Sequence, residues 1–155
     1  MQLYLLRHAD ADTVAPSDDQ RFLSEKGMMQ ASRVARYCDA HEIRPRFILT
    51  SPLRRAHQTA NEVAGHLKSE LITVRWLICG ATPAGILERL DEYKSAPSVM
   101  LVGHEPDLSG FAGFLLGSTH YGCIHVRKAT LLSIDLPELK GGYGRLEFSI
   151  PARLM

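Results

Sequence analysis

Cysteine is scarce in this chain of 155 residues, and no long hydrophobic run is present. Cys38, Cys79 and Cys123 are odd in number and lie far apart without a C-x-x-C pair. The sequence therefore indicates neither a disulfide framework nor a thiolate metal site. The apolar runs are too short to span a bilayer, and the first residues lack the basic start and long apolar segment of a secretory signal. We expect a cytoplasmic protein with no membrane partner.

Net charge is also nearly absent. Lys and Arg total 18 against 17 Asp and Glu, so no overall field favours nucleic acid or an acidic membrane surface as a partner. No internal repeat and no break in composition divides the chain. Its length suits a single domain over residues 1–155 with a continuous core. Any electrostatic role must therefore come from local clusters of charge.

Alternating strand and helix patterns predict the fold. Short apolar runs typical of buried strands lie at 3–6, 47–50, 71–76 and 98–102. Patterns typical of amphipathic helices follow them at 24–41, 51–67, 83–93 and 106–115. The runs 131–136 and 146–150 flank Pro and Gly residues and predict an antiparallel hairpin. We predict an α/β protein, a three-layer α/β/α sandwich whose central sheet has about six mostly parallel strands and ends in that hairpin.

The first predicted strand stops abruptly at Arg7 and His8. A buried strand usually leads into a turn of Gly, Asn or Ser, so a cation beside an imidazole indicates a site. Ligands of open α/β sheets bind at the carboxyl ends of the strands. By themselves the two residues are equally typical of the start of a solvated loop. Two later motifs decide between these interpretations.

The second motif, Ser-Pro-Leu-Arg-Arg-Ala-His-Gln-Thr-Ala at 51–60, directly follows a predicted strand. Ser at the cap and Pro at the first helical position predict a helix start at 51–52. Arg54 and Arg55 then face the positive end of the helix dipole, a conflict of up to about 1 kcal/mol that a bound anion would remove. The plainer alternative to an anion site is that both arginines simply lie on the surface of the helix.

The third motif places His104 after the strand 98–102 and Gly103. A lone histidine at such a position is usually structural, but its place matches that of His8. If the first, second and fourth strands are neighbours, Arg7, His8, Arg55 and His104 converge on one pocket.

Two guanidinium groups and two imidazoles make a site for a tetrahedral oxyanion. Zinc is the rival ligand for imidazole, but the arginines would repel a cation and no H-x-x-x-H pair lies on one helix. The same charges would stabilise phosphoryl oxygens and lower the pKa of a nearby histidine. A neutral imidazole can then attack phosphorus. We therefore predict a phosphoryl site without a metal or cofactor.

Together the three motifs resemble the signatures of the histidine phosphatase superfamily, also called phosphoglycerate mutase-like: Leu-Arg-His-Ala at 6–9, the ten residues 51–60, and Val-Gly-His-Glu-Pro at 102–106. The short length and the Arg-x-Leu-Ser sequence at 21–24 most resemble the SixA-type phosphohistidine phosphatases. Arg55 falls on the superfamily's pattern. Arg54 falls one residue off it, so we expect that side chain to point to solvent.

The resemblance implies a role for each matching residue. His8 would be the nucleophile that becomes phosphorylated. Arg7 and Arg55 would hold the phosphoryl oxygens, and His104 would donate to them in the transition state. Arg21 would match a further arginine on the phosphate side of the SixA-type site.

Two features depart from the superfamily's pattern. Ala9 stands where much of the superfamily has glycine, and its small size should preserve activity. The stretch 77–82 has no carboxylate, whereas relatives that act on sugar or glycerate phosphates usually carry a glutamate that protonates the leaving alcohol. A phosphohistidine substrate needs that acid less, because its protonated ring leaves as neutral imidazole. Glu105 and Asp10 adjoin the site and could substitute for the acid.

The leading hypothesis is a metal-independent phosphatase that hydrolyses phosphohistidine on a partner protein through a phosphohistidine enzyme intermediate. Residues 69–97 leave no room for a large lid, so an open pocket would admit a histidine-phosphotransfer domain or a phosphocarrier protein. The alternatives are a phosphatase of small phosphoesters with Glu105 as acid, and a non-catalytic phosphate-binding protein. A mutase is disfavoured because it must shield its intermediate from water in an enclosed pocket.

Overall fold

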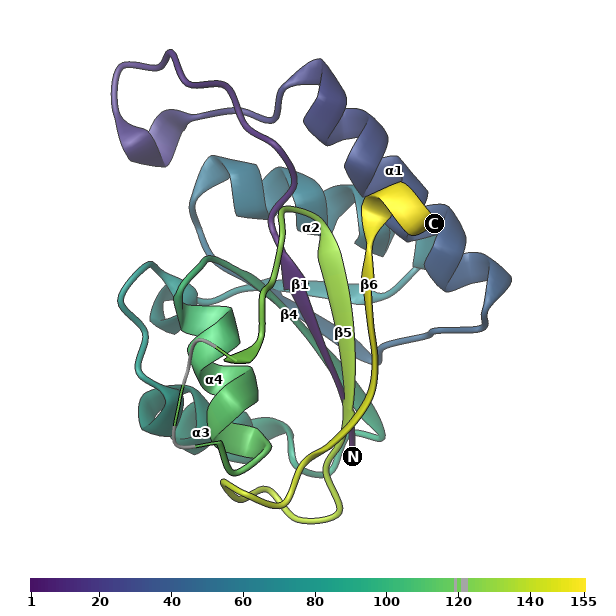
Figure 1. Cartoon of the computed structure of the whole chain (residues 1–155). Helices are drawn as coiled ribbons and strands as arrows, with labels where there is room; N and C mark the ends of the chain where they lie inside the picture. The colour runs from purple at the N-terminus through teal and green to yellow at the C-terminus, as the bar shows by residue number, and fades with distance from the viewer. Residues whose placement is uncertain (119, 121–122) are drawn as a thin grey trace.

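A six-stranded sheet forms the middle layer of our computed structural model, which describes residues 1–118, 120 and 123–155 (Figure 1). The strands are β1 (Gln2–Arg7), β2 (Phe47–Thr50), β3 (Glu70–Thr73), β4 (Ser98–Gly103), β5 (Thr130–Asp135) and β6 (Arg145–Pro151). Their order is β3-β2-β4-β1-β5-β6, with β1 to β4 parallel and the β1–β5 and β5–β6 pairs antiparallel. The predicted α/β architecture is confirmed.

Two pairs of helices cover the two faces of this sheet: α1 (Glu25–Ala40) with α2 (Arg54–Leu67), and α3 (Pro83–Leu90) with α4 (Asp107–Leu115). Successive side chains of a strand point to opposite faces. In β1, accordingly, Leu6 packs in one core with α1 and α2, whereas Leu3 and Leu5 pack in the other with α3 and α4. In the part of the chain that the structure describes, no helix is both long and apolar enough to cross a membrane.

The start of the second helix differs from the prediction. Its first residue is Arg54 and its N-cap is Leu53, so the predicted start at Ser51 and Pro52 is wrong. The backbone N–H of Ser51 donates to the carbonyl of Val102 at 3.0 Å. This bond continues the β2–β4 pairing by one residue and delays the turn into the helix.

Two other boundaries differ by a few residues. β3 ends at Thr73, earlier than the predicted strand 71–76, because the chain turns at 75–77 and buries Leu77. Helix α3 ends at Leu90, and the remainder of the predicted helix forms a single 3-10 turn. Such differences at element ends leave the order of the elements unchanged.

The parallel pairing of β4 with both β1 and β2 brings the three motifs together. Arg7 lies opposite Gly103, and Thr50 lies opposite Val102. Because the carboxyl ends of parallel neighbours meet at one edge, the segments that follow these three strands all start from the same edge of the sheet. The condition for a shared pocket is therefore met.

Helix α1 packs closely against the segment that follows β1. Ser24 caps the helix, because its hydroxyl accepts a hydrogen bond from the N–H of Gly27 at 3.1 Å. The N–H of Ser24 donates to the carbonyl of Asp10 at 3.1 Å. A Cβ atom at Gly27 would overlap that carbonyl group. Glycine at this position therefore allows the first turn of α1 to lie directly on the chain that leaves β1.

We expect Gly27→Ala to lower the free energy of unfolding by about 1–3 kcal/mol, because the atoms it would overlap belong to the backbone and cannot move aside easily. Gly65→Ala is the matched control, since an added Cβ at that position in α2 meets nothing within 4 Å. It should raise stability by about 0.5–1 kcal/mol. Urea denaturation measures both changes, and equal stabilities would contradict the close contact at Gly27.

Candidate active site

His8 lies immediately after β1, and its exposed fraction is only 7%. Its backbone N–H donates to the carbonyl of Gly103 at 3.0 Å. Its ring Nδ1 lies 2.7 Å from the carbonyl oxygen of Ala9. Because a carbonyl only accepts, Nδ1 carries the proton in this hydrogen bond, and the lone pair is left on Nε2. The ring is therefore set in the tautomer of a nucleophile.

The turn at His8 is held by α2. The N–H of Ala9 donates to Thr59 Oγ1 at 3.0 Å, and that hydroxyl donates to the carbonyl of Arg55 at 2.7 Å. Gln58 Oε1 accepts a hydrogen bond from the N–H of Leu23 at 2.8 Å. The Gln-Thr pair of the second motif thus ties the loop between β1 and α1 to α2. We did not predict this role from the sequence.

His104 follows β4 and has an exposed fraction of 2%. Its ring centroid lies 5.2 Å from that of His8, and its Nε2 lies 2.9 Å from Ser51 Oγ. Ser51 Oγ also accepts the N–H of Leu53 at 3.3 Å, so its own proton is available for Nε2. When Ser51 donates to Nε2, the ring proton of His104 lies on Nδ1, which is buried without a hydrogen-bond partner among the described residues.

The two predicted arginines lie beside these rings. Arg7 Nη1 donates to the carbonyl of Val126 at 2.8 Å, whereas its Nε is buried and has no partner in the described part of the chain. Arg55 is 5% exposed, and its guanidinium donates to the backbone carbonyl of Asp18 at 2.6 Å and to the carboxylate of Asp18 at 2.9 Å. A buried donor without a partner costs about 1–3 kcal/mol. An acceptor on the substrate would remove that cost at Arg7 and His104.

Arg21 reaches the site through the same carboxylate. Its Nη1 lies 3.1 Å from Asp18 Oδ1, and its Nε donates to the carbonyl of Asp12 at 2.6 Å. The hydrogen bond from Arg21, followed by that from Arg55, lowers the pKa of Asp18. Asp18 is thus a neighbour of the site that we did not predict. The contact of Arg21 with phosphate stays a prediction.

Arg54 points away from the site, as predicted. It is exposed, and its guanidinium lies over the ring of Phe22, 4.6 Å from the centroid. Phe22 is itself 47% exposed. Of the two adjacent arginines of the second motif, Arg55 is therefore buried at the site and Arg54 lies on the surface.

Burial keeps both histidines uncharged at neutral pH. It lowers the pKa of His8 to about 3, with smaller effects in the same direction from His104, Arg55 and Arg7. Burial also lowers the pKa of His104 to about 4, and Arg55 is the next largest cause. A neutral imidazole has a free lone pair. The site therefore combines neutral imidazoles with two arginine side chains.

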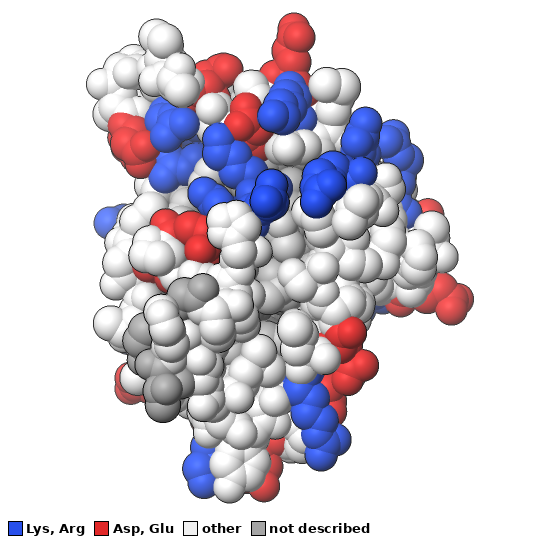
Figure 2. Space-filling view, viewed as in Figure 1, with Lys and Arg blue, Asp and Glu red and all other residues white. Residues whose placement is uncertain are grey.

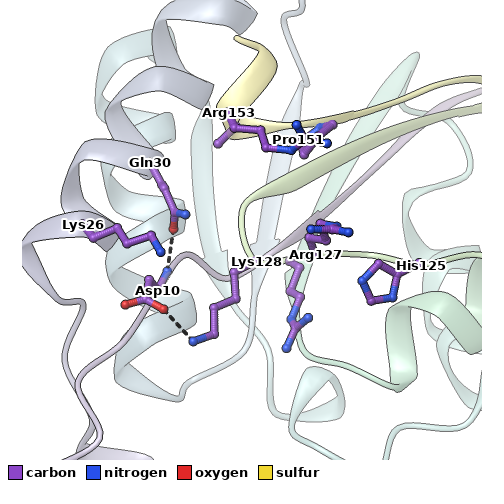
Figure 3. A pocket seen from close by; sticks show the side chains of 10 residues that line it. Asp10, Lys26, Gln30, His125, Arg127, Lys128, Pro151 and Arg153 are labelled. Atoms are coloured by element: carbon purple, nitrogen blue, oxygen red, sulfur yellow. Dashed lines mark hydrogen bonds and ion pairs between the residues drawn. The ribbon is translucent and has the colours of Figure 1, made fainter.

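The candidate acids differ in their surroundings. Asp10 accepts a hydrogen bond from Lys128 Nζ at 2.6 Å (Figure 3). It accepts another from Ser24 Oγ at 2.7 Å. Lys128 is the largest cause that lowers the pKa of Asp10, so Asp10 remains ionised and is a poor proton donor. Glu105 Oε1 accepts the N–H of Ser109 at 3.1 Å in α4. Its charge also acts on Arg7.

The acid-free stretch 77–82 does reach the site. Cys79 Sγ lies 3.8 Å from Arg55 Nη2, so this stretch presents a thiol beside the buried arginine. The carboxylate of Asp107 holds the stretch, because it accepts the N–H groups of Gly80 and Ala81 at 2.8 and 3.1 Å. Among the described residues, no three His, Cys, Asp or Glu side chains form a group that could hold a metal ion.

Comparisons with known proteins give the class of this fold and site. The sequence profile of the histidine phosphatase superfamily (branch 1) matches residues 3–78. An uncharacterized protein of Picosynechococcus sp. is 32% identical over 156 residues, which cover 95% of this chain and 89% of that protein. The phosphohistidine phosphatase SixA of Escherichia coli is 30% identical over 112 residues, which cover 68% of each chain.

Solved structures have the same fold. The protein histidine phosphatase SixA complexed with tungstate gives a TM-score of 0.88 at 24% identity, covering 99% of this chain and 98% of that chain. The alpha-ribazole phosphatase from Shigella flexneri gives a TM-score of 0.79 at 18% identity, covering 95% of each. At these identities the likeness establishes the fold alone.

The chain therefore belongs to the histidine phosphatase superfamily. Within that superfamily it is similar to the SixA proteins, and the resemblance predicted from the three motifs is confirmed.

The depressed pKa values predict how stability depends on pH. The folded-state pKa values of His8 and His104 lie below the ordinary value of 6.5, so the unfolded chain binds more protons. The two neutral buried histidines therefore contribute fully to the free energy of unfolding above about pH 6.5. Their contribution decreases as pH falls toward the folded-state pKa values, by up to about 1.4 kcal/mol per pH unit for each histidine.

We expect the free energy of unfolding in urea to fall between about pH 7.5 and about pH 5, and to fall less in His8→Gln and His104→Gln. His41→Gln is the control, because His41 is exposed and lies at the end of α1. If the free energy of unfolding of the His8 and His104 variants fell with pH as steeply as that of the wild type, burial of the neutral rings would be contradicted.

Proposed function

We propose that this protein is a metal-independent phosphatase that hydrolyses phosphohistidine on a partner protein. The observation that carries the proposal is His8, a buried neutral imidazole whose Nδ1 is occupied by the Ala9 carbonyl. Its Nε2 is then available to attack phosphorus. Similarity to the SixA protein of Escherichia coli supports this choice of activity within the superfamily.

The reaction then has two displacements at phosphorus. His8 Nε2 forms a bond to phosphorus while the bond from phosphorus to the substrate's ring nitrogen breaks. The electron pair of that bond stays on the ring nitrogen, and a substrate ring that is already protonated leaves as neutral imidazole. A water molecule next attacks the phosphorylated His8, which releases inorganic phosphate and restores the ring.

The remaining site residues would bind the phosphoryl oxygens. Arg55 is a buried cation, and Arg7 Nε and His104 Nδ1 are buried donors that have no partner among the described residues. Donors fixed before the reaction stabilise developing charge without having to reorient. Ser51 would position His104 by fixing its tautomer. Arg21, through Asp18, would adjust the position of Arg55 or contact phosphate directly.

The lack of a proton donor in the stretch 77–82 and at Asp10 favours phosphohistidine over phosphoesters as the substrate. An alcohol leaving group needs a proton in the transition state. The stretch 77–82 supplies a thiol at the site and no carboxylate of its own, and Asp10 is held ionised by Lys128. A partner protein with a phosphorylated histidine, such as a histidine-phosphotransfer domain or a phosphocarrier protein, does not require that acid.

A second candidate function is hydrolysis of small phosphoesters with Glu105 as the acid. Glu105 directly follows His104, and its charge acts on Arg7. The alpha-ribazole phosphatase of Shigella flexneri shows that the same fold occurs in a phosphatase of another name. The choice between the two substrate classes depends on whether Glu105 transfers a proton.

We expect His8→Ala to abolish phosphate release from a phosphohistidine protein, because the attacking nitrogen is removed. The loss should exceed about a thousandfold, as for other covalent nucleophiles, and it should be the same in the presence of a chelator. Phosphate release followed at neutral pH with a coupled enzymatic assay measures it, and acid-sensitive labelling of the wild-type chain should place phosphate on His8. Full activity in the variant would contradict the mechanism. Tungstate binding without any labelled intermediate would favour a non-catalytic phosphate-binding protein.

We expect Glu105→Gln to leave the turnover of phosphohistidine within about twofold, because glutamine still accepts the N–H of Ser109 and the leaving group needs no acid there. If small phosphoesters were the true substrates, their turnover would fall by about a hundredfold or more on loss of the acid. Side-by-side kinetics on free phosphohistidine and on a panel of phosphometabolites separates these outcomes. Asp12→Asn is the control, because Asp12 is an exposed carboxylate on the same loop as Asp10.

A further inference from the structure

A groove leads away from the active site along α1. A cavity of about 500 Å³ borders Arg7 and lies between Lys26 and Gln30 of α1 and the segments 125–128 and 151–153 (Figure 3). A second cavity of about 230 Å³ shares Lys26 and Gln30 with the first and extends to Arg33. A third, of about 500 Å³, continues from Arg33 to His41 and Met155. We call these three connected depressions the α1 groove.

The length of the α1 groove indicates the size of its ligand. Lys26 and His41 are 15 residues apart, and at a rise of 1.5 Å per helical residue the groove is about 22 Å long. A small phosphometabolite bound at His8 would reach only the first cavity. The surface as a whole is large enough to receive a segment of another protein.

The charge of the α1 groove indicates the chemistry of that protein. Lys26, Arg33, Arg36, Arg127, Lys128 and Arg153 line it. Among the described residues that line it, Asp10 is the one Asp or Glu, and Lys128 already pairs with it at 2.6 Å. Figure 2 shows Lys and Arg side chains gathered in a band over the part of the molecule that carries α1 and the C-terminal turn. Six Lys and Arg side chains besides Arg7 thus line one groove that begins at the active site, in a chain whose net charge is only +1.

Flexible apolar side chains lie within the same groove. Met29 is 59% exposed and lines the second cavity, and Met155 lines the third. Methionine adapts its shape to different surfaces because it is unbranched and polarizable. Methionines among the cations would contribute apolar contact area to a partner whose charge is complementary.

We propose that the α1 groove docks an acidic surface of the phosphohistidine-bearing protein and so directs its phosphorylated side chain to His8. This inference rests on the proposed function and adds the charge and location of the partner's contact surface. Arg7 belongs both to the active site and to the first cavity, so a protein seated in the groove lies next to the reacting atoms. Complementary charge would act mainly on the rate of association.

The test uses Arg33→Glu/Arg36→Glu, which reverses two exposed charges in the groove without touching the catalytic residues. The control is Arg89→Glu, an exposed arginine of α3 on the other face of the sheet. The probes are an acidic histidine-phosphotransfer domain phosphorylated with phosphoramidate, the same domain with its acidic residues near the histidine changed to lysine, and free phosphohistidine. Circular dichroism checks that every variant is folded.

For the acidic domain we expect kcat/KM of the groove variant to fall about tenfold at low salt, within the range of electrostatic steering, and the difference to shrink as salt rises. Free phosphohistidine should be hydrolysed at the wild-type rate by the same variant, and Arg89→Glu should match the wild type on every probe. The lysine-substituted domain should be a poor substrate of the wild type and should improve with the groove variant.

Three results would overturn the docking proposal: unchanged kinetics of the groove variant on the acidic domain, equal rates on the two domains, or an equal loss on free phosphohistidine. The last would identify the groove as a subsite for small anions. If the wild type hydrolyses neither free nor protein-bound phosphohistidine, the proposed function fails. Calorimetric binding of the unphosphorylated acidic domain to wild type and variant then tests the groove separately, and equal affinities would overturn it.

Discussion

The parallel pairing of β4 with both β1 and β2 is the constraint on which the rest of the structure depends. It places Arg7 opposite Gly103 and Thr50 opposite Val102, and so it brings three segments from distant parts of the chain to one edge of the sheet. A slip of one residue in either register would turn the apolar side chains of a strand to the opposite face. The two hydrophobic cores therefore hold the active-site residues in position.

Burial has opposite consequences for the two kinds of basic side chain at this edge. It keeps His8 and His104 neutral, because an imidazole loses its proton easily when it is removed from water. A guanidinium keeps its charge, so Arg55 stays cationic although it is 5% exposed, and Asp18 compensates part of that charge. One environment thus holds neutral imidazoles beside a buried cation.

Charge on this chain is separated in space, although it nearly cancels in sum. The cations of the α1 groove continue from the active site toward the C-terminal residues, whereas several other surface charges are paired with one another. Because exposed charges are screened within about 8–10 Å at ordinary ionic strength, such a cluster acts over short distances. Its influence therefore falls on whatever lies in or close to the α1 groove.

The sequence by itself determined the order of strands and helices, because periodicity is a local feature. Strand-end motifs, which are also local, predicted the candidate site residues Arg7, His8, Arg55 and His104, and the structure brings the segments that carry them to one edge of the sheet. The tertiary structure alone decided which partners those residues have. Ser51 illustrates the difference: local propensity made it a helix cap, whereas its side chain lies against His104, 53 positions away. The neutral rings and the α1 groove likewise arise from burial and contacts between distant segments, which no local pattern records.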